Sequence, residues 1–312
     1  MKSIASNHFP RIVFDGTNPA LFNPVLKKRF KNRPEERVRL KWVEFLIHQT
    51  DWPKSRIGFE APVQLWQEKN SLRADLILYN KEMKPEVLIE CKAESVRLSQ
   101  SVAEQAARYN TQVGAPFICL TNGLTDFWFR VNEGRVSALD MDSGLTIPFN
   151  KTASFSDLKK DLQWWSDRGF CSPNFPEQHS DTLSQSIIHF WSQSIDWPAQ
   201  YLNFPASPIP IGIQQYYRIP VIDNRKKLAI SFAGAPNHSS FLVAILNEKG
   251  QNRSLLTINL NKLAHQHEES GSLLTEGNQS TFAAHKTLPL FQHGFSPKTI
   301  EQLPVYLMRF FD

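Results

Sequence analysis

Apolar residues recur at helical spacing near the start of the chain. Within residues 33–50, Leu40, Val43 and Ile47 stand three and four positions apart, which places them on one face of a helix. Pro34 suits the first turn of that helix, because the backbone N–H that proline lacks has no partner there in any case. The pattern therefore predicts a helix that buries one apolar stripe.

Strand-like patterns and a second helix follow. Branched and aromatic residues dominate three segments, a helix-like segment with a glycine at its end comes next, and two more strand-like segments complete the run. In order, these segments are residues 57–66, 72–79, 87–93, 99–114, 116–123 and 125–131. The order of helix, three strands, helix and two strands predicts an α/β fold with a mixed sheet.

The pattern changes beyond about residue 141, where we expect a second, α+β domain. Two amphipathic helices, a Pro-rich stretch, three strands and a long polar loop are predicted there. They are residues 157–170 and 180–197, then 203–212, then 226–233, 240–247 and 254–260, and finally 265–280. We expect the first domain to span residues 1–145 and the second to span residues 146–312.

The composition is that of an ordinary globular protein, with 41% hydrophobic and 21% charged residues. The net charge of +5 and the sequence pI of about 9.0 suit a polyanion partner such as nucleic acid. Residues 1–150 carry most of the excess, with 21 Lys and Arg against 17 Asp and Glu. Three scattered cysteines and the lack of a long apolar run predict a cytoplasmic protein that neither carries a signal peptide nor spans a membrane.

Three side chains on two neighbouring predicted strands form the candidate site. Side chains alternate between the faces of a strand, so Glu90 and Lys92 share one face. If the strands at 72–79 and 87–93 pair as a hairpin, Asp75 and Glu90 approach each other. This arrangement predicts two carboxylates beside an amine on one surface.

These groups have the chemistry of a metal-dependent hydrolase. Two carboxylates, water and a backbone carbonyl, for which Cys91 is our candidate, form an oxygen-rich site that suits Mg²⁺, with Mn²⁺ as a substitute. The metal would polarise a phosphodiester and help to make a hydroxide nucleophile. Lys92 would orient or deprotonate the water, or stabilise charge on the phosphate.

Five short motifs in order resemble the N-terminal nuclease domain of type I restriction enzyme R subunits, a branch of the PD-(D/E)xK superfamily. The motifs are RPEERVR, RAD, IECKA, EQAARYN and LTNG, within about residues 30–135. The resemblance implies a restriction-endonuclease-like core, in which helices flank a mixed central sheet. It also implies cleavage of DNA in restriction or in defence against foreign DNA or a mobile element.

The resemblance assigns roles to individual residues. Asp75 matches the first metal-ligand acid of the family, and Glu90-Cys91-Lys92 matches its E-x-K motif. Gln105 and Tyr109 match its Q-x-x-x-Y motif, whose side chains contact the site and the DNA backbone.

A carboxylate on the first helix also recurs in the family, near the catalytic site and its metal. Glu36 is our choice for it, because it extends the apolar stripe of the helix, and Glu35 remains open. Arg39, Arg73 and Arg108 flank the proposed site and are candidate phosphate contacts, with surface solubility as the alternative interpretation.

The sequence also departs from full R subunits, which continue into an ATP-driven motor. It has no G-x-x-x-x-G-K-[ST] motif, so we expect these residues not to translocate DNA alone. We therefore expect a metal-dependent DNA endonuclease that works with a motor or specificity subunit or as a homodimer. The alternative is a catalytically silent nucleic-acid-binding or scaffold subunit.

Overall fold

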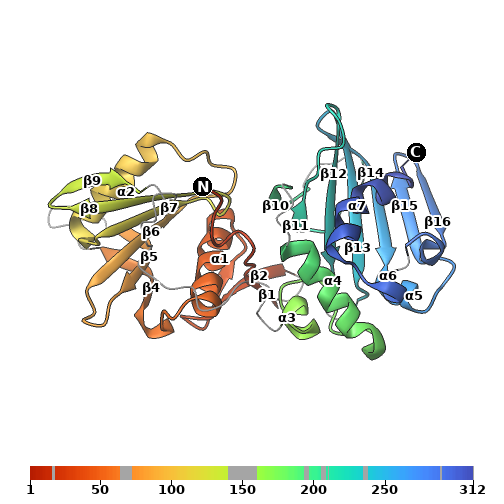
Figure 1. Cartoon of the computed structure of the whole chain (residues 1–312), viewed down its shortest axis with the longest axis horizontal. Coiled ribbons are helices and arrows are strands. Elements are labelled where there is room, and N and C mark those ends of the chain that lie inside the picture. The colour runs from red at the N-terminus through yellow and green to blue at the C-terminus, as the bar shows by residue number, and fades with distance from the viewer. Residues whose placement is uncertain are drawn as a thin grey trace. The chain divides into compact units, whose positions relative to one another are not determined.

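A computed structural model of the chain shows two compact units, Met1–Leu158 and Lys159–Asp312 (Figure 1). The structure describes residues 1–15, 18–63, 72–139, 160–192, 197–204, 209, 211–234, 238–288 and 290–311. Helices and strands are mixed in both units, which confirms the predicted α/β character of the chain. The expected domain boundary at residues 145 and 146 lies outside the described residues.

A six-stranded mixed sheet forms the centre of the first unit. Its strands lie side by side in chain order: β4 (Ile57–Val63), β5 (Leu72–Tyr79), β6 (Pro85–Cys91), β7 (Phe117–Thr121), β8 (Asp126–Asn132) and β9 (Arg135–Ala138). All neighbours are antiparallel except β6 and β7, which run parallel. A parallel pair needs a crossover connection, and α2 (Gln100–Val113) supplies it. The predicted hairpin of β5 and β6 is confirmed.

The first unit's α-helices α1 and α2 pack on opposite faces of the sheet. In the β5–β6 ladder Leu76 pairs with Ile89, and both belong to a buried cluster that includes Trp42 of α1 (Pro34–Gln49). The next residue of the ladder, Leu88, belongs to a second cluster with Tyr109 of α2. Because successive strand residues face opposite sides, α1 and α2 cover the two faces of the sheet between them.

The sequence analysis missed four short strands in this unit. Strands β1 (Arg11–Asp15), β2 (Asn18–Asn23) and β3 (Lys28–Lys31) form a three-stranded antiparallel sheet, and β9 pairs with β8. These strands span only four to six residues, too few to show a clear alternation. Their tertiary contacts fix them instead, since the Phe30 ring of β3 lies 5.2 Å from the ring of Phe59 in β4.

A seven-stranded antiparallel sheet forms the second unit. Its strands again lie in chain order: β10 (Ala199–Leu202), β11 (Gln215–Arg218), β12 (Lys226–Ala233), β13 (Phe241–Glu248), β14 (Gln251–Asn259), β15 (Gly271–Thr275) and β16 (Asn278–Phe282). In Figure 1, α4 (Ser180–Ser192) and α7 (Pro297–Met308) lie in front of this sheet. The ring of Phe190 in α4 lies 5.5 Å from that of Phe232 in β12, so α4 covers one face.

Three shorter α-helices and two 3-10 helices complete the described part of this unit. They are α3 (Leu162–Ser166), α5 (Leu260–Ala264) and α6 (Leu290–His293), with 3-10 helices at Glu177–His179 and Ala284–Lys286. Helix α3 occupies only part of the predicted helix at residues 157–170. The first three residues of that predicted helix, 157–159, lie outside the described part of the chain. No helix in the described residues is long and apolar enough to cross a membrane.

The prediction of a long polar loop at residues 265–280 is wrong. Strands β15 and β16 pair there as a hairpin in which Thr275 faces Asn278. The two residues between them include Gly277, whose φ of +85° is a conformation that glycine adopts without strain. The exposed polar side chains of β16 concealed the strand, because a sheet edge that faces water carries little apolar signal.

We expect Trp42→Ala to destabilise the first unit by about 3–5 kcal/mol, because it leaves a cavity between α1 and the sheet. Trp42 is fully buried, with its ring 6.0 Å from that of Trp128. Calorimetric unfolding of the full chain measures the loss. Phe127→Ala is the matched control, because Phe127 is 44% exposed and should change stability little. Equal effects of the two substitutions would contradict the assigned packing.

Candidate functional site

The candidate site lies where the central sheet is interrupted at Asp75. The β4–β5 ladder pairs Phe59 with Leu76 and resumes at Ala61 and Ala74, which leaves Glu60 and Asp75 out of the pairing. Glu60 has a φ of +49°, a conformation that costs free energy for a non-glycine residue. Local strain of this kind therefore marks the position opposite Asp75.

On the side of β5 that faces β6, the side chain of Asp75 accepts a hydrogen bond from the backbone of β6. The β5–β6 ladder ends at Leu76 and Ile89, and the backbone N–H of Cys91 donates to Oδ2 of Asp75 at 2.8 Å. A carboxylate that accepts a backbone N–H has a fixed orientation. The end of β6 therefore holds Asp75 in place.

Glu90 and Lys92 lie together at the end of β6, as the alternation of strand side chains predicts. Nζ of Lys92 donates to Oε1 of Glu90 at 2.8 Å. The backbone N–H of Lys92 donates to the carbonyl oxygen of Thr121 at 2.8 Å, which extends the parallel ladder with β7 by one step. The two side chains are therefore held on a continuous piece of sheet.

Asp75 and Glu90 lie close enough to influence each other's ionisation. Burial raises the pKa of Asp75 above its ordinary value, although Arg39 and the Cys91 N–H act in the opposite direction. Burial also raises the pKa of Glu90, and the negative charge of Asp75 raises it further. A nearby cation stabilises such a pair, and carboxylate oxygens are ligands that Mg²⁺ prefers. The pair therefore fits a divalent cation.

Arg39 lies at the centre of the carboxylates, in a place that differs from the exposed phosphate contact expected from the sequence. Its guanidinium is 2.6 Å from Glu36, 3.0 Å from Glu60 and 2.8 Å from Oδ1 of Asp75, and the residue is only 7% exposed. Burial lowers the pKa of Arg39, but Asp75 and Glu36 outweigh it and raise the pKa above the usual value. The guanidinium therefore stays charged and joins α1 to β4 and β5.

The structure distinguishes the two glutamates of the first helical turn. Glu36 is buried and contacts Arg39, whereas Glu35 is exposed. Oε1 of Glu36 accepts from Arg39, and Oε2 is buried without a hydrogen-bond partner in the described part of the chain. Glu36 thus belongs to the cluster through Arg39.

The carboxylates surround a guanidinium instead of converging on one point. Within the described residues, no group of three or more His, Cys, Asp or Glu side chains could hold a metal ion. Arg39 accounts for this arrangement, because it separates Glu36 and Glu60 from the pair formed by Asp75 and Glu90. Glu36 therefore contacts Arg39, and the metal contact expected for it from the resemblance stays a prediction.

Helix α2 presents the Gln/Tyr pair as its spacing predicts. Nε2 of Gln105 donates to the Tyr109 hydroxyl at 3.2 Å, and both side chains are half-buried. Arg108 on the same helix is exposed. Arg73 of β5 is also exposed, with its guanidinium 3.8 Å from Glu60. Both arginines are accessible to an incoming polyanion.

Two further residues of the site region escaped the sequence analysis. Lys41 of α1 is fully buried, and its Nζ lies 2.8 Å from Oε1 of Glu94, two residues beyond Lys92. This ion pair fastens the chain that follows β6 to α1. A lysine between Leu40 and Trp42, both in apolar stripes, was the available signal, and so was Glu94, which continues the alternation of Glu90 and Lys92.

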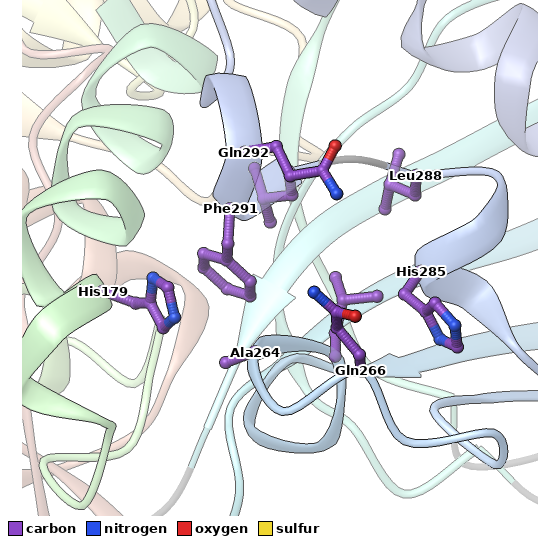
Figure 2. Close-up of a pocket in the computed structure, with 9 residues that line it drawn as sticks. His179, Ala264, Gln266, His285, Leu288, Phe291 and Gln292 are labelled. Atoms are coloured by element: carbon purple, nitrogen blue, oxygen red, sulfur yellow. The ribbon is translucent and has the colours of Figure 1, made fainter.

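A small pocket in the second unit contains none of the sequence-predicted site residues. It encloses about 110 Å³, and its lining mixes apolar residues with the polar side chains of Gln266, His285 and Gln292. Figure 2 shows the ring of Phe291 beside His179, with the two ring centres 5.0 Å apart. Ligand pockets usually enclose roughly 300–1,000 Å³, so this pocket is small for a ligand.

Residues 34–143 match the family described as the type I restriction enzyme R protein N terminus. No curated protein and no solved structure matches the chain. The matched segment begins with α1 and includes the whole β4–β9 sheet and α2. The resemblance of the short motifs to the type I restriction enzyme R protein N terminus is therefore confirmed for this segment, whereas its nuclease activity and its place in the PD-(D/E)xK superfamily stay predictions. Strands β1–β3 and the second unit lie outside the match.

We expect Glu90→Gln to stabilise the first unit at neutral pH, by about 1 kcal/mol for each unit by which folding raises the pKa of Glu90. The folded protein holds this proton to a higher pH than the unfolded chain does. The carboxyl therefore costs stability as the pH rises from its ordinary pKa of 4.5 through the raised value. Calorimetry at about pH 4 and about pH 8 measures the difference.

The gain should be small at the lower pH and largest at the higher pH. Glu104→Gln provides the control, because Glu104 is an exposed carboxyl on α2 and its substitution should leave stability unchanged at both pH values. A gain for Glu90→Gln that is the same at both pH values would show that burial of its charge is not the cause.

Proposed function

We propose, from the match of residues 34–143 to the R protein N terminus, that this segment is a PD-(D/E)xK-type nuclease core that hydrolyses phosphodiester bonds in DNA with Mg²⁺. The observation that carries the proposal is the meeting of Asp75, in the middle of β5, with Glu90 and Lys92 at the end of β6. The family match points to a restriction system, and cleavage of foreign or mobile DNA in the cytoplasm is the role that we assign.

Asp75 and Glu90 would hold the metal ion, with the carbonyl of Cys91 as a further oxygen ligand. Bound there, Mg²⁺ or Mn²⁺ supplies Lewis-acid polarisation of the phosphodiester and acidifies a bound water. The Cys91 N–H fixes Oδ2 of Asp75, so this carboxylate needs little rearrangement on binding. The Cys91 thiol takes no part, because burial raises its pKa well above the usual value and keeps it protonated.

Lys92 acts as a fixed positive charge. Burial lowers its pKa, but the hydrogen bond to Glu90 and the charge of that carboxylate outweigh burial and raise the pKa above its ordinary value. A protonated ammonium cannot accept a proton from water, which argues against deprotonation of the water by Lys92. Stabilisation of charge on the scissile phosphate is the role that we propose for it, and orientation of the water remains the alternative.

The DNA backbone would lie along α2 and the start of β5. Arg73 and Arg108 are exposed there and would pair with phosphates, and the Gln105–Tyr109 pair would position the strand beside Lys92. The described parts of the second unit show no comparable set. Its proposed role is to contact a motor or specificity subunit, or a second copy of the chain.

We expect Asp75→Ala, Glu90→Ala and Lys92→Ala each to lower Mg²⁺-dependent cleavage of plasmid DNA by about 100-fold or more, because each removes a group that acts on the scissile phosphate. Conversion of supercoiled plasmid to nicked or linear forms measures the rate. Glu82→Ala is the matched control in an exposed turn and should cut at the wild-type rate.

DNA binding by the same variants separates a nuclease from a silent binding module. Binding should persist in Lys92→Ala at a reduced level, since the exposed arginines remain. If the wild-type chain binds DNA but does not cut it with Mg²⁺ or Mn²⁺, and the three substitutions leave binding unchanged, the scaffold alternative replaces the nuclease.

We expect Arg73→Ala and Arg108→Ala to weaken DNA binding on any sequence, because phosphate contacts carry no base information. Each lost phosphate contact should reduce the slope of log affinity against log salt by about 1. Fluorescence anisotropy with a labelled duplex at several salt concentrations measures both quantities. Arg253→Ala, on an exposed ion pair of the second unit, serves as the control, and an equal loss with it would remove the assignment to α2 and β5.

A further inference from the structure

Arg39 contacts the carboxylate that is central to the proposed metal site. Its NH2 group lies 2.8 Å from Oδ1 of Asp75, and its NH1 group lies 2.6 Å from Glu36 and 3.0 Å from Glu60. The remaining oxygen of Asp75 accepts the Cys91 N–H. Each oxygen of Asp75 therefore already has one partner, and one of these partners is a permanent cation.

The charges of this cluster leave room for one divalent ion. Its four carboxylates are those of Asp75, Glu90, Glu36 and Glu60, and its two mostly buried cations are Arg39 and Lys92. Arg73 also lies 3.8 Å from Glu60, but its side chain is 62% exposed, so water and salt screen its charge and it is left out of the balance. Four negative charges against two positive charges leave a formal charge of −2. A single Mg²⁺ neutralises that charge, whereas a second ion would leave an excess of +2 in a largely buried place.

Many nucleases use two metal ions about 3.5–4 Å apart to stabilise the attacking and leaving oxygens. A guanidinium on Asp75 can supply positive charge at the position of the second ion, because arginine is always protonated in proteins. Burial of Arg39 among three carboxylates fixes its place, so the charge is available without recruitment from solution.

We propose that Arg39 takes the electrostatic place of a second metal ion, so that this site holds one divalent cation. The inference rests on the proposed function, since it concerns the metal that Asp75 and Glu90 would bind. Arg39 is a positioning residue in this account: it orients Asp75 and sets the charge that the metal meets. It also gives the buried carboxylate of Glu36 a function without direct metal contact.

Titration of the full chain with Mn²⁺ alone tests this inference, with the number of bound ions read by calorimetry and by electron paramagnetic resonance of the free ion. The wild-type chain should bind one Mn²⁺. Arg39→Met should bind a second Mn²⁺, because the loss of one positive charge makes the formal charge of the cluster −3 and releases Oδ1 of Asp75. Arg39→Lys keeps the charge and should bind one ion.

The possible outcomes separate this inference from the proposed function. If the wild-type chain binds one ion and Arg39→Met also binds one with unchanged affinity, the role of Arg39 is wrong and the nuclease proposal stands. Two ions in the wild-type chain would likewise overturn the role of Arg39 alone. No Mn²⁺ binding by the wild-type chain would overturn the proposed metal site and this inference with it.

A second variant keeps the test decisive if Arg39→Met fails to fold. Glu60→Gln removes one negative charge from the cluster, including the ion pair of Glu60 with Arg39, and leaves the Arg39–Asp75 and Glu90–Lys92 pairs intact. It should weaken Mn²⁺ binding by about tenfold through charge. Glu82→Gln removes an exposed carboxylate outside the cluster and should leave the affinity unchanged. Equal Mn²⁺ affinities for the wild-type chain and Glu60→Gln would contradict the charge balance on which the inference depends.

Discussion

The buried ion pair between Arg39 and Asp75 is the contact on which the proposed site depends. It joins α1 to β5 at the point where the pairing of β4 with β5 is interrupted, and the Arg39 guanidinium lies 2.8 Å from Oδ1 of Asp75. Without the guanidinium, Glu36, Glu60 and Asp75 would be buried or half-buried charges beside one another, a costly state. The remaining geometry follows, because Asp75 is then held between Arg39 and the N–H of Cys91, beside the Glu90–Lys92 pair.

Packing on both faces of the sheet makes this arrangement possible. Helix α1 is anchored by Trp42 against one face, and α2 is anchored by Tyr109 against the other. The parallel pairing of β6 with β7 requires a crossover connection, which α2 supplies. This crossover places Tyr109, and with it the Gln105–Tyr109 pair, against the sheet that contains β6. The apolar faces thus supply the stability, and the interrupted middle of β5 and the end of β6 carry the charged groups, which an apolar core would disfavour.

Much of the site could be predicted from the sequence, because short-range spacing decides it. The strand alternation that places Glu90 with Lys92, the hairpin that brings Asp75 near and the helical spacing of Gln105 and Tyr109 all depend on local periodicity. The burial of Arg39 could not be predicted, since its partner Glu60 lies 21 residues away at a position with a positive φ. The short strands β1–β3 and β9 were missed because four to six residues show no clear alternation. The hairpin of β15 and β16 was missed because the exposed polar side chains of β16 carry little apolar signal.

The central claim is that Asp75 and Glu90 bind one divalent cation beside Lys92. A crystal structure of the chain grown with Mn²⁺, with anomalous diffraction recorded to locate the metal, tests it most directly. The account predicts one anomalous peak within coordination distance of both carboxylates, at about 2.0–2.4 Å, with Arg39 still paired to Asp75. A peak that contacts neither carboxylate, or a chain that shows no peak at saturating Mn²⁺, would contradict it.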